Sequence, residues 1–412
     1  MDRRNTTITH IILFCLAMTI ISPKVVAESK WEEDGWLNTV LAQDRLANGD
    51  EFGCYEIPGL SWKNDPGAVA LECRNYIEDR VIASQWGDNP ISTYVPEGLT
   101  MAQHEIIAQQ GFVIHGDKTG LQDSAWHDQE DTPNDLWDWY NLGRRGGSLE
   151  QVAGSVSELK TAVDSGGLVN MYWIGRVNEA NIRHDSAIED YISDDADAWL
   201  TTWGESWSYW AKSRCYEFSR DVEQIDGAYV LTFQSLITQQ CLSLQSERWN
   251  VPATWIIDIG ESEIISIVAD GINMSNIQGE RHTTEGFSHN NSQYLHLSVR
   301  DGVEVKITME SSQYDIVGLA EFWNNHSAAI TIAAHETSDL FKWSKRFVDS
   351  EDLVFTWLIQ PRDLDEKLDW IPYVAIAVGL GVITSMLLIL RKEGLGPLAD
   401  KNNTNNLSLI HI

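Results

Sequence analysis

The residues best suited to chemistry lie between positions 104 and 135, where histidines and carboxylates are densest. His115 and Asp117 directly follow an apolar run typical of a strand, and His127 and Asp128 come shortly afterwards. The carboxyl ends of strands in α/β folds commonly carry ligand-contacting residues. Imidazole and carboxylate together can bind a divalent metal, which would activate water for hydrolysis. These four residues are therefore a candidate metal site.

Known catalytic signatures are missing around this candidate. His104-Glu105 lacks the second histidine of the zinc-protease motif H-E-x-x-H, and neither G-x-S-x-G nor a glycine-rich phosphate loop occurs. Acid-rich stretches usually solvate a loop, which is the alternative interpretation. Nearby, Trp137, Trp139 and Tyr140 alternate with aspartates and form a candidate ligand-binding surface. Beyond this candidate metal, the sequence leaves the cofactor unknown.

The elements that would position these residues follow a repeated order of helix, glycine and strand. Thr100 can cap a helix that Gly111 ends, and "FVIHGD" follows as a strand. Ser148 likewise precedes a helical segment that ends at Gly166, and "LVNMYWIG" follows. This order predicts an α/β or α+β region with a partly parallel sheet, and it is too common to indicate one family.

After about residue 252 the apolar period drops to two. Roughly seven strand candidates, from "TWIIDIG" to "DLVFTWLIQP", occupy the stretch before residue 362, as expected of a β-sandwich. Asp301-Gly302 between two of them predicts a hairpin turn. The glycosylation sequons expected to lie outside the cell begin at Asn273, Asn290 and Asn325.

A row of tryptophans recurs at helical spacing further upstream. A capping box at Ser186 can begin a helix on which Trp199, Trp203, Trp207 and Trp210 share one face. Such a stripe could be a buried core, a stacking surface for a ligand or a membrane-surface helix. The acidic opposite face argues against the membrane, and exposed aromatic stripes are rare, so we interpret the row as core.

The two ends of the chain predict its topology. Residues 1–27 have the basic start, short apolar run and small-residue cleavage point of a secretory signal peptide, with an uncleaved anchor as the alternative. Residues 370–390 are uncharged, apolar and long enough to span a bilayer, and Arg391-Lys392 follow on the expected cytoplasmic side. The sequence thus predicts a single-pass membrane protein with an extracellular N-terminal region and a short cytoplasmic tail at 391–412.

Charge and cysteine content agree with an exterior location. The formal net charge is −32, which disfavours nucleic acid and anionic lipid as partners. Outside the signal peptide the cysteines are even in number, and we expect the short-range pairs Cys54 with Cys73 and Cys215 with Cys241. A zinc site is the alternative, but the spacings match no zinc finger.

The fold class predicted from these patterns is an α+β or α/β membrane-distal domain at 28–250, an all-β sandwich-like membrane-proximal domain at 251–362 and one C-terminal transmembrane helix. Self-association is a further hypothesis, through the small residues Ala377, Gly381 and Ser385 of that helix. The predicted function is a cell-surface protein whose acidic, disulfide-containing ectodomain binds an unidentified ligand or partner. The alternatives are a membrane-anchored metal-dependent hydrolase and a structural component of the cell envelope.

Overall fold

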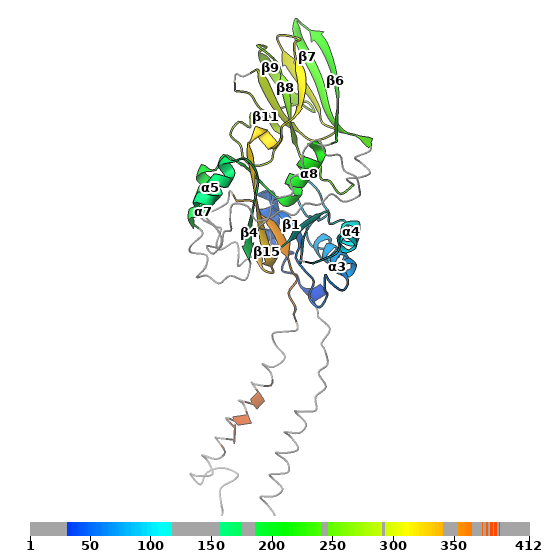
Figure 1. Ribbon diagram of the computed structural model, residues 1–412, viewed down its shortest axis with the longest axis vertical. Helices are drawn as coiled ribbons and strands as arrows, with labels where there is room; N and C mark the ends of the chain where they lie inside the picture. The colour runs from blue at the N-terminus through cyan, green and yellow to red at the C-terminus, as the bar shows by residue number, and fades with distance from the viewer. Residues whose placement is uncertain are drawn as a thin grey trace, which may run out of the picture. The chain divides into compact units, whose positions relative to one another are not determined.

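The computed structural model describes residues 31–96, 98–117, 156–174, 186–213, 215–239, 246–290, 293–340 and 353–364, and single residues between 373 and 387. Within this range, Trp31–Arg362 form one compact unit (Figure 1). That unit contains one parallel sheet, two antiparallel sheets and the helices that cover them.

The parallel sheet joins the beginning and the end of this unit. Its strands run in the order β3-β2-β1-β16-β15-β4, and β5 also pairs with β15. The first strand of the unit lies beside the last in the middle of this sheet, which has the form of a half-barrel. The strand bounds are β1 (Glu51–Cys54), β2 (Ser92–Val95), β3 (Ile114–Asp117), β4 (Gly167–Ile174), β5 (Trp199–Thr201), β15 (Ala328–Thr337) and β16 (Thr356–Ile359).

Short, well-capped helices cover one face of this sheet. Thr39 and Asp65 accept backbone N–H groups at the starts of their helices, and Thr100 forms a capping box with Gln103. In Figure 1, α3 and α4 lie near β1, whereas α5 and α7 lie near β4. The helical bounds are η1 (Trp31–Glu33), α2 (Val40–Ala47), α3 (Pro66–Glu78), α4 (Met101–Gln109), α5 (Val156–Asp164), α7 (Ser186–Asp190) and the π-helical turn η2 (Tyr191–Asp195).

The opposite, inner face of the sheet is filled by α8 (Trp203–Ser213). Every residue of this helix is buried, and it contacts β3 and β15 on one side and the antiparallel strand β8 on the other. Trp203 packs so closely on β3 that a Cβ atom at Gly116 would lie 2.0 Å from its ring. α8 is therefore a core helix shared by the parallel sheet and the sandwich.

The tryptophan row is core, as predicted, but it does not lie on one helix. Trp199, Trp203, Trp207 and Trp210 are all fully buried. Trp199 belongs to strand β5, and the chain turns at Thr202 before α8 begins. The helix-like spacing of the four tryptophans is therefore coincidental: a strand and a helix bury their indoles in the same apolar cluster.

Two antiparallel sheets pack face to face around a separate apolar core. The five-stranded sheet has the order β10-β9-β13-β7-β6, and the four-stranded sheet has the order β11-β12-β8-β14. Phe233, Trp255, Leu297 and Ile307 meet between them. The bounds are β6 (Tyr216–Ile225), β7 (Ala228–Ile237), β8 (Ala253–Asp258), β9 (Ile264–Ala269), β10 (Ile272–Asn273), β11 (Gly286–Ser288), β12 (Tyr294–Val299), β13 (Glu304–Met309) and β14 (Asp315–Leu319), and the 3-10 turn η3 (Trp323–Asn325) follows.

The predicted fold class is wrong in the way it divides the chain. β6 and β7 precede residue 250 yet belong to the antiparallel sandwich, whereas β15 and β16 follow it and complete the parallel sheet. The sandwich is thus inserted between β5 and β15 of the half-barrel. The physical reason is that β15 and β16 are apolar runs of strand length, and such runs suit either kind of sheet.

The predicted transmembrane helix at 370–390 is also corrected. None of the helices in the described part of the chain is long and apolar enough to cross a membrane. Ala377 and Gly381 are helical and exposed, and Ser385 lies outside the described residues, so association through them stays a prediction.

The cysteine and sequon predictions fall mainly on described residues. Cys54 and Cys73 form a disulfide between β1 and α3, as predicted. Cys215 is also disulfide-bonded, and its predicted partner Cys241 lies outside the described residues. The three sequon asparagines, whose glycosylation stays a prediction, are exposed: Asn273, Asn290 and Asn325.

Candidate functional site

Three ring-bearing side chains meet where the parallel strands end. Tyr55 directly follows β1, Tyr94 lies on β2 and His335 lies on β15. The two tyrosine rings stack with centroids 4.7 Å apart, and the imidazole meets them edge-on at 5.9 Å and 5.2 Å. Side chains from several strand ends therefore converge at the carboxyl edge, where α/β folds commonly bind ligands.

A bulge in β15 adds Glu336 to this group. The register with β16 shifts between Ala334 and Thr337, and Glu336 adopts a positive φ of 52°. This backbone conformation costs about 1–3 kcal/mol in a residue that is not glycine. In return, the Tyr55 hydroxyl donates a 2.7 Å hydrogen bond to Glu336 Oε1. We call Tyr55, Tyr94, His335 and Glu336 the carboxyl-edge cluster.

Polar groups continue beyond the cluster on the neighbouring strand ends. Gln360 follows β16, and its side-chain amide donates a 2.7 Å hydrogen bond to Glu56 Oε1. Its backbone N–H donates to the Thr337 carbonyl, which holds the bulged strand against β16. Glu56, Glu336 and Gln360 are half-buried, whereas the two tyrosines and His335 are buried.

The electrostatic setting keeps Tyr55 in its neutral form. Burial raises the pKa of this phenol, and the hydrogen bond to Glu336 raises it further. Tyr55 is consequently a proton donor that fixes the direction of the Glu336 carboxylate. The cluster can hydrogen-bond to a ligand through carboxylate, imidazole and amide groups that are held by the sheet.

The candidate metal site predicted from the sequence is only partly described. Buried His115 lies on β3, where its Nδ1 is 2.8 Å from His104 Nδ1 and its Nε2 is 2.8 Å from the Phe112 carbonyl oxygen. Both ring nitrogens therefore already have protein partners. The described residues contain no group of three or more histidine, cysteine or acidic side chains able to hold a metal.

The remaining predicted site residues are not placed by the structure. Asp117 is the last residue of β3, but its side chain is outside the description. The same holds for His127 and Asp128, and for the predicted aromatic surface of Trp137, Trp139 and Tyr140. The metal and aromatic sites therefore stay predictions.

The buried histidine pair leads to a prediction about acid stability. Burial, with a smaller contribution from neighbouring His104, lowers the pKa of His115 to about 3. Unfolded histidine titrates near 6.5, so this group stabilises the fold above that pH and loses its contribution as the pH falls. We expect the free energy of unfolding to drop by about 2 kcal/mol between pH 6.5 and 5 from this residue. Urea denaturation of the wild type and His115→Gln at both pH values would check it, and equal drops in the two proteins would contradict it.

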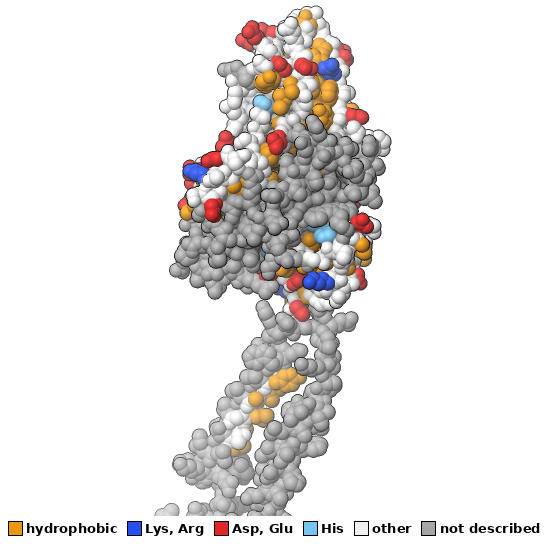
Figure 2. Space-filling model, viewed as in Figure 1, with side chains coloured by type: hydrophobic (Ala, Val, Ile, Leu, Met, Phe, Trp, Pro, Cys, Tyr) orange, Lys and Arg blue, Asp and Glu red, His pale blue; other side chains and the backbone are white. Residues whose placement is uncertain are grey.

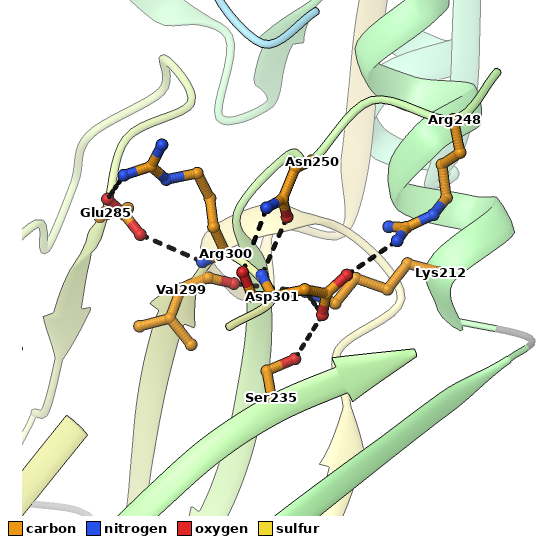
Figure 3. Close-up of polar contacts among 8 residues, drawn as sticks. All are labelled: Lys212, Ser235, Arg248, Asn250, Glu285, Val299, Arg300 and Asp301. Carbon is orange, nitrogen blue, oxygen red and sulfur yellow. Dashed lines mark hydrogen bonds and ion pairs between the residues drawn. The ribbon is translucent and has the colours of Figure 1, made fainter. Parts of the chain in front are cut away.

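A second polar cluster, shown in Figure 3, ties α8 to the sandwich. Asp301 is 2.8 Å from both Lys212 Nζ and Arg248 Nη2, and its Oδ1 accepts a 2.8 Å hydrogen bond from Ser235. Burial alone would raise the pKa of Asp301, but Lys212 and Arg248 outweigh it and lower the pKa to about 2. Lys212 is completely buried. This enclosed ion network is suited to holding elements together rather than to contacting a ligand.

Surface charge does not single out another site. A hollow of about 450 Å³ near α5 and η2 is lined by Lys160, Tyr191 and several aspartates, and much of its lining is exposed. On the face drawn in Figure 2, acidic side chains are dispersed over the described surface and basic ones are sparse. The carboxyl-edge cluster is the better candidate, because strands distant in sequence position it together.

No protein-family model, curated protein or solved structure matches this chain.

Sequence reasoning missed the carboxyl-edge cluster for an identifiable reason. The rule that placed His115 and Asp117 at a strand end applies equally to His335 and Glu336, which end "AAITIAAHET". That segment was interpreted as a sandwich strand, where the carboxyl end has no special role. The sequence signal for this site was a strand of alanine and β-branched residues with His335 and Glu336 at its carboxyl end.

Proposed function

We propose that this protein acts outside the cytoplasm as a binding protein, and that the carboxyl-edge cluster binds a polar, hydroxyl-rich ligand such as an oligosaccharide. The observation that carries the proposal is the strained backbone of Glu336, which aims its carboxylate at Tyr55 beside His335 and Tyr94. Strain of this kind persists where the surrounding structure holds it, and it is concentrated at functional sites.

The chemistry of the cluster favours this class of ligand. Carboxylate, imidazole and amide groups exchange hydrogen bonds with hydroxyl groups, and the buried, stacked tyrosines hold these polar groups in place. The described residues of the cluster and its neighbours Glu56 and Gln360 include no lysine or arginine. An anionic ligand would meet two carboxylates there, in a chain whose net charge is −32.

Two features support a location outside the cytoplasm. The Cys54–Cys73 disulfide, which closes a loop of 19 residues, is typical of an oxidising compartment. The first residues of the chain have the pattern of a secretory signal. The alternative function as a metal-dependent hydrolase gains no supporting observation from the described residues.

A binding experiment with two substitutions tests the proposal. The full chain would be screened on an array of neutral oligosaccharides, and the best of these would be titrated by calorimetry. Glu336→Gln removes the charge from the acceptor, and we expect it to weaken binding roughly 10- to 100-fold, the usual worth of a charged hydrogen bond. Tyr55→Phe keeps the ring stack but removes the hydroxyl that orients Glu336, so a smaller loss is expected.

The matched control is Glu304→Gln on the sandwich strand β13, where the carboxylate is 53 % exposed and pairs with Lys306. This change alters the net charge equally and should leave binding unchanged. The proposal is overturned if no neutral oligosaccharide binds, or if the control weakens binding as much as Glu336→Gln does.

A further inference from the structure

Two carboxylic acids lie close together in the dry interior where β1 meets α8. Glu51 is the first residue of β1 and Glu205 lies in the first turn of α8. Their exposed fractions are 1 % and 2 %. Neither residue belongs to the carboxyl-edge cluster, and the proposed ligand site makes no use of them.

Glu205 is surrounded by hydrogen-bond donors. The Trp86 indole N–H donates to Oε1, and Oε2 receives the Thr201 hydroxyl at 2.9 Å and the Thr202 N–H at 3.4 Å. The Thr283 hydroxyl also contacts Oε2 at 3.4 Å, while its own oxygen accepts from the Trp199 indole. Indole and backbone N–H groups can only donate, so this carboxyl must accept at both oxygens. Glu205 is therefore placed as an ionised carboxylate.

Glu51 has a different environment at each oxygen. Its Oε2 accepts the Gly204 backbone N–H at 2.7 Å and the Thr202 hydroxyl at 2.9 Å. Its Oε1 makes no hydrogen bond of ordinary geometry among the described residues, and neither does the buried hydroxyl of Ser92, whose interaction with the Glu51 carboxyl lowers the pKa of that group. The Ser92 hydroxyl can either donate to Oε1 or accept a proton from it, whereas the other three carboxyl oxygens of the pair each face an N–H group that can only donate, so among the described contacts Oε1 is where a proton fits. Glu51 is therefore placed as the protonated acid.

The charges around the pair agree with one proton shared between two acids. Burial raises the pKa of Glu51 and of Glu205 to about 7, and a negative charge on one acid disfavours a second charge on the other. The basic side chains on the surrounding elements have other partners. Lys212 of α8 pairs with Asp301, and Arg281 beside Thr283 donates to carbonyls of Ile192, Ser193 and Ala196. Asp50, which directly precedes Glu51, is buried and pairs with Arg45. Asp88 and His282 are further titratable neighbours in sequence.

We propose that Glu51 and Glu205 form a proton-binding pair that carries a single negative charge in the folded protein, with Glu205 ionised and Glu51 protonated, and that loss of the Glu51 proton loosens α8 from the parallel sheet and the sandwich. The pair stands where three parts meet: β1 supplies Glu51, α8 supplies Glu205, and the sandwich segment before β11 supplies Thr283. A second negative charge in this enclosed space would repel the first without a nearby cation to offset it.

The sign of the pH dependence follows from the raised pKa. An acid that titrates near 4.5 when unfolded and near 7 when folded gives stability that is complete below 4.5 and is lost as the pH rises through 7. For one such group, the equilibrium constant for unfolding should rise about 30-fold between pH 5.5 and 8.

Two glutamines distinguish the roles of the two acids in the full chain. Glu51→Gln mimics the protonated acid, because its amide can donate toward Ser92 while its oxygen accepts from Gly204 and Thr202. We expect this variant to lose the 30-fold rise and to be at least as stable as the wild type at pH 8. In Glu205→Gln, the side-chain NH2 group must face either the Trp86 indole N–H or the Thr202 backbone N–H, and both of these are donors. We therefore expect a lower melting temperature at both pH values.

Hydrogen exchange of the wild type provides a readout that needs no variant. After correction for the intrinsic effect of pH, protection of Trp203–Ser213 should fall from pH 6 to 8.5, while the β6–β7 hairpin keeps its protection. The proposal is overturned if Glu51→Gln retains the wild-type pH dependence, if the two glutamine variants behave alike, or if protection of α8 does not change with pH. Loss of oligosaccharide binding in Glu336→Gln would leave each of these outcomes unaffected.

Discussion

Replacing Asp301 with asparagine should lower the free energy of unfolding by about 3–5 kcal/mol, the usual result of removing one partner from a buried ion pair. Lys212 is completely buried, and its 2.8 Å contact with Asp301 is the charge interaction that offsets its desolvation. Burial already lowers the pKa of Lys212 to about 8, although Asp301 opposes the shift. Without the carboxylate, the folded protein must either bury an uncompensated ammonium or release its proton.

A second variant distinguishes the loss of the Lys212–Asp301 attraction from the cost of leaving the Lys212 charge buried without a partner. In the double variant Lys212→Met with Asp301→Asn, no charge remains buried at this point apart from the side chain of Arg248, and much of the lost stability should return. Urea denaturation followed by tryptophan fluorescence measures all three proteins. The control is Lys306→Met, because the Lys306–Glu304 pair is more than half exposed and should contribute less than 1 kcal/mol. A loss below 1 kcal/mol for Asp301→Asn, or no recovery in the double variant, would contradict this account.

The turn at Asp301 also shows that strand pairing could not be predicted from the local sequence. Asp301-Gly302 has the composition of a hairpin turn, and Gly302 does adopt a positive φ of 88°. The strands on either side nevertheless belong to different sheets, so the turn crosses the sandwich. Two tight hairpins of the described chain, β6–β7 at Asp226-Gly227 and β9–β10 at Asp270-Gly271, were not predicted. Dipeptides specify a local turn, whereas the partner of each strand depends on long-range packing.

Elements whose signals are local were predicted well. α4 begins at the capping box of Thr100 and ends before Gly111, which has a φ of 94°, and β3 follows as expected. The strand after Gly166-Gly167 is also present, as β4. These segments carry caps, glycines and apolar runs within a few residues of one another, so no distant contact is needed to identify them.

The candidate site depended on the contacts that sequence could not supply. Its residues come from β1, β2 and β15, and the last is separated from the first by the whole inserted sandwich. The bulge that aims Glu336 has no glycine or proline to mark it. Strain at such a position is visible only after the pairing of β15 with β16 is known.

Trp203→Ala should be the other severe substitution, with an expected loss of about 3–5 kcal/mol in the free energy of unfolding. The side chain is fully buried at the point where α8 enters the half-barrel, and its indole N–H donates a 2.9 Å hydrogen bond to Asn170 Oδ1. Alanine would leave a cavity between α8 and β3 and would take one donor from Asn170, which also accepts from the Thr331 hydroxyl. Tyr294→Ala on the sandwich, where the ring is 37 % exposed, is the control and should cost much less.

The contact between Trp203 and Gly116 offers a sharper test of the same packing. Gly116→Ala alone should cost about 1–3 kcal/mol, because the new Cβ would lie 2.0 Å from the indole unless the ring moves. Trp203→Phe alone should also destabilise the protein, since it leaves space above the glycine. Combined, the added methyl group fills part of the space that the smaller ring vacates, so the double variant should lose less than the sum of the two single losses. Strict additivity in urea denaturation would mean that Trp203 does not rest on Gly116, and that α8 does not fill the half-barrel in the way its burial indicates.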